Sequence, residues 1–97
     1  MNKTLLFHLI DGKDVIAEVV RNNEGVYLKS PFEFLFSPQG AGLIPFMAMA
    51  KGHIIPYPQS EHIMFTVEPA DNLLEEYEKA ANPSSIETPR KQELLVP

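Results

Sequence analysis

The sequence contains no cysteine and few basic residues, and each scarcity excludes a class of function. Without cysteine the chain has no disulfide, no thiolate nucleophile and no cysteine-ligated zinc, which is compatible with a reducing, cytoplasmic location. Eight Lys and Arg residues stand against 13 Asp and Glu, for a formal net charge of −5. Nonspecific nucleic-acid binding relies on cations that neutralise phosphates, so the composition leaves room only for a localised site.

The sequence also lacks an apolar run long enough for a membrane span or a signal peptide. The apolar stretch near the N-terminus is short and is interrupted by His8 and Asp11. We therefore expect no membrane partner and interpret Thr4 to Ile10 as a strand in which His8 is a wall residue. A length of 97 residues fits one domain with a modest core, which we place at residues 1–82.

The stretch from Leu9 to Phe36 is the richest in β-branched and aromatic residues. It contains two turn signals, Asp11-Gly12 and Asn22-Asn23-Glu24-Gly25, which predict strands bent back on each other. The strand between them, from Lys13 to Arg21, has apolar residues on both faces: Val15, Ala17 and Val19 on one, Ile16 and Val20 on the other. In a short chain, covering both faces of a strand predicts a strongly bent sheet that closes into a small barrel.

The next strand, from Val26 to Phe36, contains Pro31, which must lie at an edge or a bend because proline lacks the N–H that a central ladder needs. Three phenylalanines follow it at a period of two and so share one face, which we assign to the core or to a subunit contact. They are Phe32, Phe34 and Phe36.

The remaining β-structure is less sharply defined by the sequence. Ser37 to Gly42 holds two glycines and a proline and is expected to be a loop. Leu43 to Tyr57 is either one long strand broken at Gly52 or two strands. His62 to Glu68 is expected to be the last strand, since it alternates at the β period and Pro69 stops it.

After Pro69 the apolar period changes to that of a helix, which we expect over about residues 71–81. Asn72 with Glu75 forms a candidate capping box, and Asp71 is the alternative cap. The buried side of the helix is expected to hold Leu73, Tyr77, Ala80 and Ala81. The sequence therefore predicts an all-β fold with a short C-terminal helix, built as a small, five-stranded, strongly bent barrel.

Residues 83–97 contain prolines among polar residues and show no regular period. We expect an extended or disordered tail there, with Leu94-Leu95-Val96 as a candidate anchor on a neighbour.

The run from Asp11 to Val19 resembles the opening of the Sm-like (Lsm) family of small, SH3-like barrels. In that family a similar Asp-Gly turn joins the first two strands and is followed by two apolar residues, a small residue, a polar residue and an apolar one. Val15 and Ile16 match the apolar pair, Ala17 the small residue and Val19 the last apolar position. The family's commonest arrangement places its short helix before the first strand, whereas here the helix is expected at the end.

The resemblance implies homo-oligomeric rings, formed by pairing the edge strands of adjacent subunits, with single-stranded RNA bound at loops that face the pore. The corresponding positions are the turn between the second and third strands, with Asn22, Asn23 and Tyr27, and either Lys51-Gly52-His53 or Ser60-Glu61-His62 ahead of the last strand. The turn from Asn22 to Tyr27 is shorter than the family motif and lacks its Asp and its stacking residue. We therefore expect weak or absent RNA binding.

No catalytic motif is evident. The three His residues have no ligand spacing and no recognisable nucleophile, although Glu61-His62 and Asp11 or Asp14 could meet in space. We expect no enzyme activity, no metal and no cofactor. An Sm-like oligomeric binding module is the preferred hypothesis, a subunit that binds a protein partner without nucleic acid is the alternative, and a small enzyme or metal-binding protein ranks last.

Overall fold

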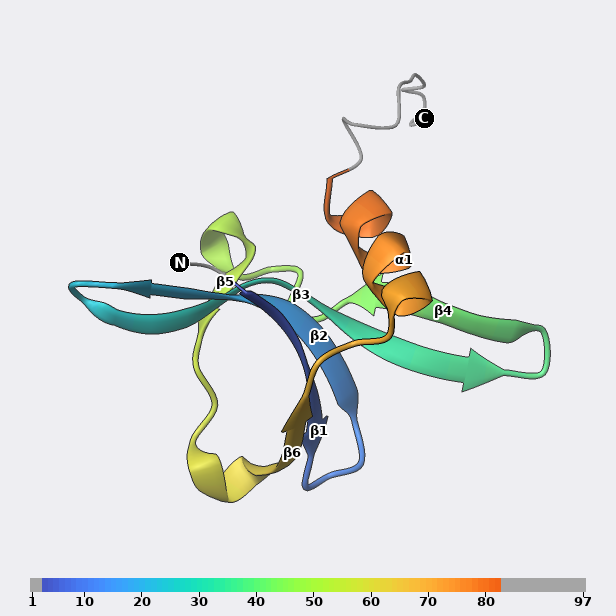
Figure 1. Cartoon of the computed structure of the whole chain (residues 1–97), viewed down its shortest axis with the longest axis horizontal. Coiled ribbons are helices and arrows are strands. Elements are labelled where there is room, and N and C mark those ends of the chain that lie inside the picture. Colours follow the sequence, from blue (N-terminus) through green and yellow to red (C-terminus); the bar gives the residue numbers. More distant parts are fainter. Residues whose placement is uncertain (1–2, 83–97) are drawn as a thin grey trace.

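The computed structural model describes residues 3–82 and consists mainly of one antiparallel sheet with a short helix after it (Figure 1). The all-β fold with a C-terminal helix is therefore confirmed. The tail predicted for residues 83–97 lies outside the described residues. The elements are β1 (Lys3–Leu9), β2 (Asp14–Asn22), β3 (Gly25–Ser37), β4 (Gly40–Pro45), β5 (Ile54–Pro56), β6 (Ile63–Val67) and α1 (Asp71–Ala81), with single 3₁₀ turns η1 (Lys51–His53) and η2 (Ser60–His62).

The strands follow the order β4-β3-β2-β1-β6, and β5 pairs with the first part of β3. Strand β3 thus has two partners on one side: β5 opposite Tyr27–Lys29 and β4 opposite Phe32–Ser37. Within residues 3–82 no ladder joins β5 to β6. The sheet therefore has a barrel-like curvature without being closed by hydrogen bonds.

The sheet bends at Ser30 and Pro31. The pairing of β2 with β3 changes register there, from Ile16 opposite Phe32 to Glu18 opposite Lys29, and Ser30 adopts a φ of 51°. This extra length in β3 is a β-bulge, which bends a strand and increases its twist. The expectation that Pro31 lies at a bend is confirmed. In Figure 1 the two ends of β3 consequently leave the centre as hairpin arms that point in opposite directions, the β2–β3 arm and the β3–β4 arm.

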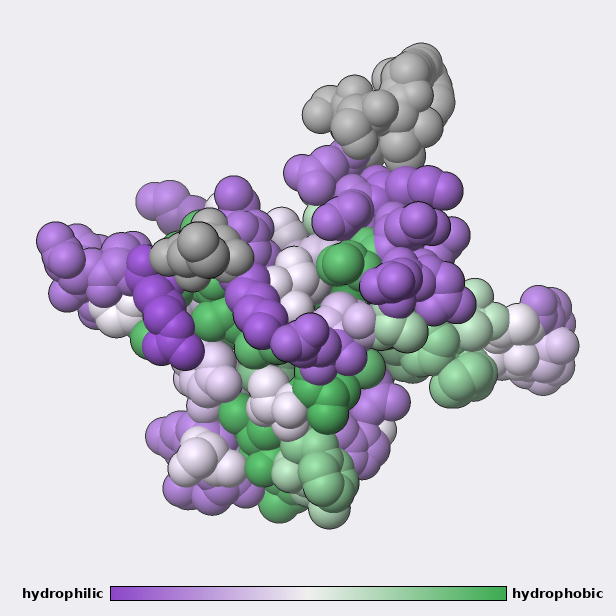
Figure 2. Space-filling model, viewed as in Figure 1, coloured by the Kyte–Doolittle hydropathy of each residue, from purple (hydrophilic) through white to green (hydrophobic). Residues whose placement is uncertain are grey.

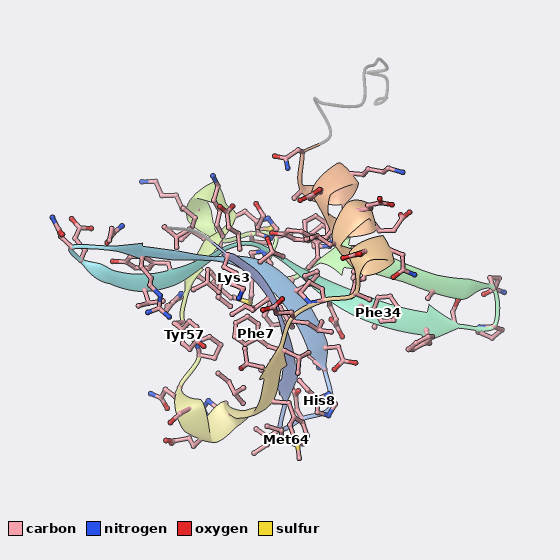
Figure 3. All side chains as sticks on the ribbon, viewed as in Figure 1. Lys3, Phe7, His8, Phe34, Tyr57 and Met64 are labelled. Atoms are coloured by element: carbon pink, nitrogen blue, oxygen red, sulfur yellow. The ribbon has the colours of Figure 1, made fainter. Side chains whose placement is uncertain are left out.

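The concave face of the sheet holds the larger core. Phe7, Ala17, Val19 and Leu28 are buried there, and Ile55, Tyr57 and Ile63 pack against them with other half-buried residues. The rings of Phe7 and Tyr57 point toward each other (Figure 3) and meet edge to face, with centroids 5.7 Å apart. Residues of β5, of the segment after it and of β6 all pack on this core. The core therefore holds β5 and β6 together, although no ladder connects these two strands.

The other face is covered by α1. Tyr77 is buried with Ile16 and Phe32, and Leu73, Ala80 and Ala81 pack against this cluster. The predicted buried side of the helix is confirmed, as is the burial of β2 on both faces. The Tyr77 hydroxyl donates to the carbonyl oxygen of Ser30 at 2.9 Å and lies 3.2 Å from that of Lys29. The helix thereby binds the backbone at the bend itself.

Several local predictions were wrong. Gly40 to Gly42 begins β4 instead of lying in a loop, because the turn closes in two residues, with the hydroxyl of Ser37 donating to the carbonyl oxygen of Gly40. Of the two alternatives for Leu43 to Tyr57, the two-strand one is confirmed, since Pro45 ends β4, Met47 turns the chain with a φ of 56°, and β5 follows. Residues 3–82 therefore form six strands, one more than the expected five.

The predicted helix caps were also wrong. The N-cap is Ala70, without a side-chain cap bond, and the Asn72 side chain accepts from Leu73 N–H inside the first turn. Asn72 and Asp71 are already helical and so cannot cap in the usual way.

Of the three aligned phenylalanines, Phe32 is in the core, whereas Phe36 is 79% exposed near the tip of the β3–β4 arm, where its ring contacts Phe34.

Candidate functional site

The two ends of the sheet, β4 and β6, each pair on one side only among the described residues. Both carry exposed apolar side chains, which are Ile44 on β4 and Met64, Phe65 and Val67 on β6. Figure 2 shows apolar residues gathered at the lower end of the molecule, where β1 and β6 lie in Figure 1, and along the β3–β4 arm. Unpaired, apolar edge strands favour association with another strand unless they are covered.

Two of the predicted RNA-contacting residues lie together beside β5. Asn22 and Tyr27 line a hollow of about 540 Å³ with Val20, Glu24, Lys29 and Ile54. The side-chain oxygen of Asn22 accepts from the Glu24 N–H at 2.8 Å, so it stabilises the turn. Asn23 is exposed at the tip of the same turn. The hollow offers one aromatic ring and one cation, with the carboxylate of Glu24 nearby.

His53 and Lys51 belong to the segment between β4 and β5. The half-buried His53 ring has its Nε2 2.9 Å from the carbonyl oxygen of Phe46 and meets the ring of Phe32 edge to face at 5.8 Å. Its side chain therefore holds this segment against the core. Lys51 is exposed.

His62 lies elsewhere, beside a third feature that we call the η2 pocket. This pocket has a volume of about 440 Å³ and is lined by Leu9, Ile10, Asp11, Phe46, Met47, Ile55, Pro56, Pro58 and His62. Asp11 and His62, which sequence reasoning paired as residues that could meet, do share it. The pocket forms because the Ile10 N–H donates to the His62 carbonyl oxygen at 3.0 Å, joining the end of β1 to η2.

The predicted RNA residues thus lie in three places instead of one. Asn22, Asn23 and Tyr27 are on the β2–β3 arm, His53 faces the core, and His62 borders the η2 pocket. In a ring, a single ligand would be bound by loops that come from several subunits. The single chain does not bring these side chains into one site.

Sequence reasoning missed a pairing between His8 and Asp14. These residues face each other across the β1–β2 ladder, with His8 Nδ1 2.5 Å from Asp14 Oδ1, and the His8 ring lies beside Phe65. The available signal was that His8 and Asp14 lie equally many positions before and after Asp11, so a hairpin that turns at Asp11 places them opposite each other. Both side chains are about two-fifths exposed, at 41% and 38%, so the pair lies at the surface next to edge strand β6.

The charged groups of the turn also interact with each other. The backbone N–H of Lys13 donates to Asp11 Oδ1 at 3.1 Å and, with the Lys13 ammonium, holds the pKa of the Asp11 carboxyl below its ordinary value. Asp11 is therefore ionised at neutral pH beside the η2 pocket. At the other end of β1, the Lys3 ammonium lies 2.8 Å from Glu68 and lowers the pKa of that carboxyl.

Between residues 3 and 82, no group of three His, Asp or Glu side chains is placed to hold a metal ion. None of the helices in this part of the chain is long and apolar enough to cross a membrane. Models of known protein families and curated protein sequences give no match to this chain. Its function must therefore be inferred from its own residues and geometry.

Proposed function

We propose that the chain is the subunit of an Sm-like homo-oligomer, an assembly that acts as a binding module. The observation that carries this proposal is the pair of unpaired apolar edges, β4 and β6, at opposite ends of one sheet. Pairing β4 of one copy with β6 of the next continues the sheet from subunit to subunit. Such a head-to-tail contact closes into a ring or extends into a filament, depending on the rotation between copies.

The energetics of the two edges support this assembly. Each edge has main-chain N–H and C=O groups available for a new ladder. Met64, Phe65 and Val67 on β6 are 49–61% exposed, and burying an apolar side chain contributes roughly 1.5–3 kcal/mol. The order β6-β1-β2-β3, with its Asp-Gly turn and its strong bend, agrees with the Sm-like resemblance of Asp11 to Val19.

Assembly can be tested by placing a charge on the β6 edge. We expect light scattering to give an oligomer for the native chain at tens of micromolar and a much smaller particle for Phe65→Lys, because a lysine on an edge strand opposes pairing. Met49→Lys is the matched control, since Met49 is 98% exposed and lies outside every strand. A native chain that is monomeric at this concentration would contradict the proposal.

Single-stranded RNA is the ligand favoured by one specific feature, the hollow on the β2–β3 arm. There Tyr27 supplies a ring for base stacking and Lys29 a cation for a phosphate. Glu24 and the net charge of −5 oppose a polyanion. The proposed RNA contact is therefore weak in a single subunit and gains strength only from repetition around an oligomer.

Fluorescence anisotropy with labelled oligo-uridine tests the RNA proposal. We expect binding that is weak, that falls steeply between low and physiological salt, and that is lost in Tyr27→Ala and Lys29→Ala. Lys51→Ala should change it less, because Lys51 does not line the hollow. Submicromolar, salt-resistant and base-selective binding would contradict the expected weakness, and no binding at low salt would leave a protein partner as the ligand.

A further inference from the structure

The η2 pocket is an open apolar site that the proposed edge pairing does not use. Seven of its nine lining residues are apolar, and the exceptions are Asp11 and His62. Its volume of about 440 Å³ falls in the range of pockets that hold ligands or anchoring side chains. Ile10 and Met47, which border it, are 58% and 56% exposed. An apolar occupant would remove this surface from water.

The side of the pocket formed by the segment between β4 and β5 is held in place by hydrogen bonds. The Ala50 N–H donates to the Met47 carbonyl oxygen, and the His53 ring binds the carbonyl oxygen of Phe46. Met47 keeps a positive φ in this arrangement. A methionine on a fixed backbone gives a pocket an adaptable apolar wall, because its unbranched thioether chain fits side chains of different shapes.

The one formally charged side chain among those that line the η2 pocket is the Asp11 carboxylate. Asp11 is ionised at neutral pH for the reasons given above, and its closest cation, Lys13, is exposed with its ammonium 3.6 Å away. A basic residue on an occupant can therefore approach the same carboxylate. The chemistry of the pocket favours a peptide in which a short apolar run lies close to a Lys or Arg.

The chain itself contains such a segment. Arg90-Lys91 is followed after two residues by Leu94-Leu95-Val96. We propose that Leu94-Leu95-Val96 of one copy docks in the η2 pocket of a neighbouring copy, with Arg90-Lys91 facing Asp11. The inference rests on the proposed homo-oligomer, which supplies the neighbour.

The length of the chain favours a neighbour over the same copy. Leu94 lies twelve positions after Asn82, the last described residue, and twelve fully extended residues span about 40 Å. In Figure 1 the end of α1 lies at the top of the molecule and the turn that contains η2 lies at the bottom. A copy would have to lead this segment from one end of the molecule to the other to fill its own pocket, whereas an adjacent subunit of the proposed oligomer presents a second pocket.

The test uses disulfide cross-linking, for which the cysteine-free chain is a clean background. Full-length Leu95→Cys and full-length Met47→Cys are mixed and mildly oxidised, and mixed dimers are identified by mass. A disulfide needs Cα atoms within about 7 Å, so docking should favour this pair strongly. The control mixture replaces Met47→Cys by Glu24→Cys, which is exposed on the β2–β3 arm. We expect about tenfold more mixed dimer than in the control, because docking raises the effective concentration.

Two results would overturn the inference: equal yields of mixed dimer in the two mixtures, or an intramolecular disulfide as the main product of the Leu95→Cys, Met47→Cys double variant. Light scattering of the native chain separates the two proposals. An oligomer that gives no preferential cross-link leaves the edge-strand assembly standing and removes the docked tail, whereas a monomer removes the assembly itself. A second mixture, of Met47→Cys with Arg90→Cys, should also cross-link preferentially. Changing Leu94, Leu95 and Val96 of the Arg90→Cys chain together to Ser should abolish that preference.

Discussion

Replacing Phe7 by Ala is expected to lower the free energy of unfolding by about 3–5 kcal/mol, the range for large-to-small changes in a core. Phe7 is fully buried, at 0% exposure, and its ring contacts Tyr57 at 5.7 Å. The cavity cannot collapse easily, because Phe7 lies between β2 on one side and the segment after β5 on the other. Urea unfolding at a fixed protein concentration measures the change.

The control for Phe7→Ala is Phe36→Ala, which deletes the same side chain from a position that is 79% exposed. It should cost less than about 1 kcal/mol, as expected for a surface substitution. Small domains are stable by only about 5–15 kcal/mol, so Phe7→Ala is expected to leave a measurable unfolded fraction at moderate temperature. Similar costs for the two variants would show that the concave core is not the main source of stability.

The sequence was sufficient to predict the parts of the fold that depend on local pattern. The alternation from Val15 to Val20 predicted a strand buried on both faces, and the helical period predicted the side of α1 that carries Tyr77. Pro31 marked the bend because its missing N–H excludes it from a continuous ladder. These signals all act within a few residues.

The features missed by sequence reasoning depend on contacts between distant residues. Tyr77 and Ser30 are 47 positions apart, so nothing local indicated that the helix binds the carbonyl groups at the bend. The strand character of Gly40 to Gly42 comes from pairing with β3, which overrides the low strand propensity of glycine. Ala70 replaced a polar cap because tertiary packing through Tyr77 holds the helix without one.

The candidate sites were harder to predict than the fold. The residues assigned to RNA came from a family pattern, and the chain distributes them among the β2–β3 arm, the core side of His53 and the η2 pocket. The pocket draws on residues 9–11, 46–47, 55–58 and 62, which no spacing rule connects. The unpaired edges β4 and β6, in contrast, follow directly from the strand order, which leaves the sheet open at both ends.

Replacing Tyr77 by Ala is expected to cost about 3 kcal/mol or more and to reduce assembly as well. The substitution empties the second core, removes the edge-to-face contact with Phe32 at 5.9 Å, and leaves the carbonyl oxygen of Ser30 without its hydroxyl donor. Since α1 binds at the bend, its loss should also change the angle at which the β3–β4 arm presents edge strand β4. Urea unfolding and light scattering on the same variant measure the two effects.

The milder variant Tyr77→Phe isolates the hydroxyl and is expected to cost about 1 kcal/mol at about pH 8, the usual net value of a hydrogen bond. Burial raises the pKa of Tyr77 from 10.0 to about 12. Between these values the unfolded chain loses the phenolic proton while the folded chain keeps it, so the native protein loses stability as the pH rises. Tyr77→Phe lacks this proton, and the two proteins have every other titratable group in common. The stability difference between native and Tyr77→Phe protein should therefore shrink from about pH 8 to about pH 11, and a difference that stays constant would show that the hydroxyl is open to water.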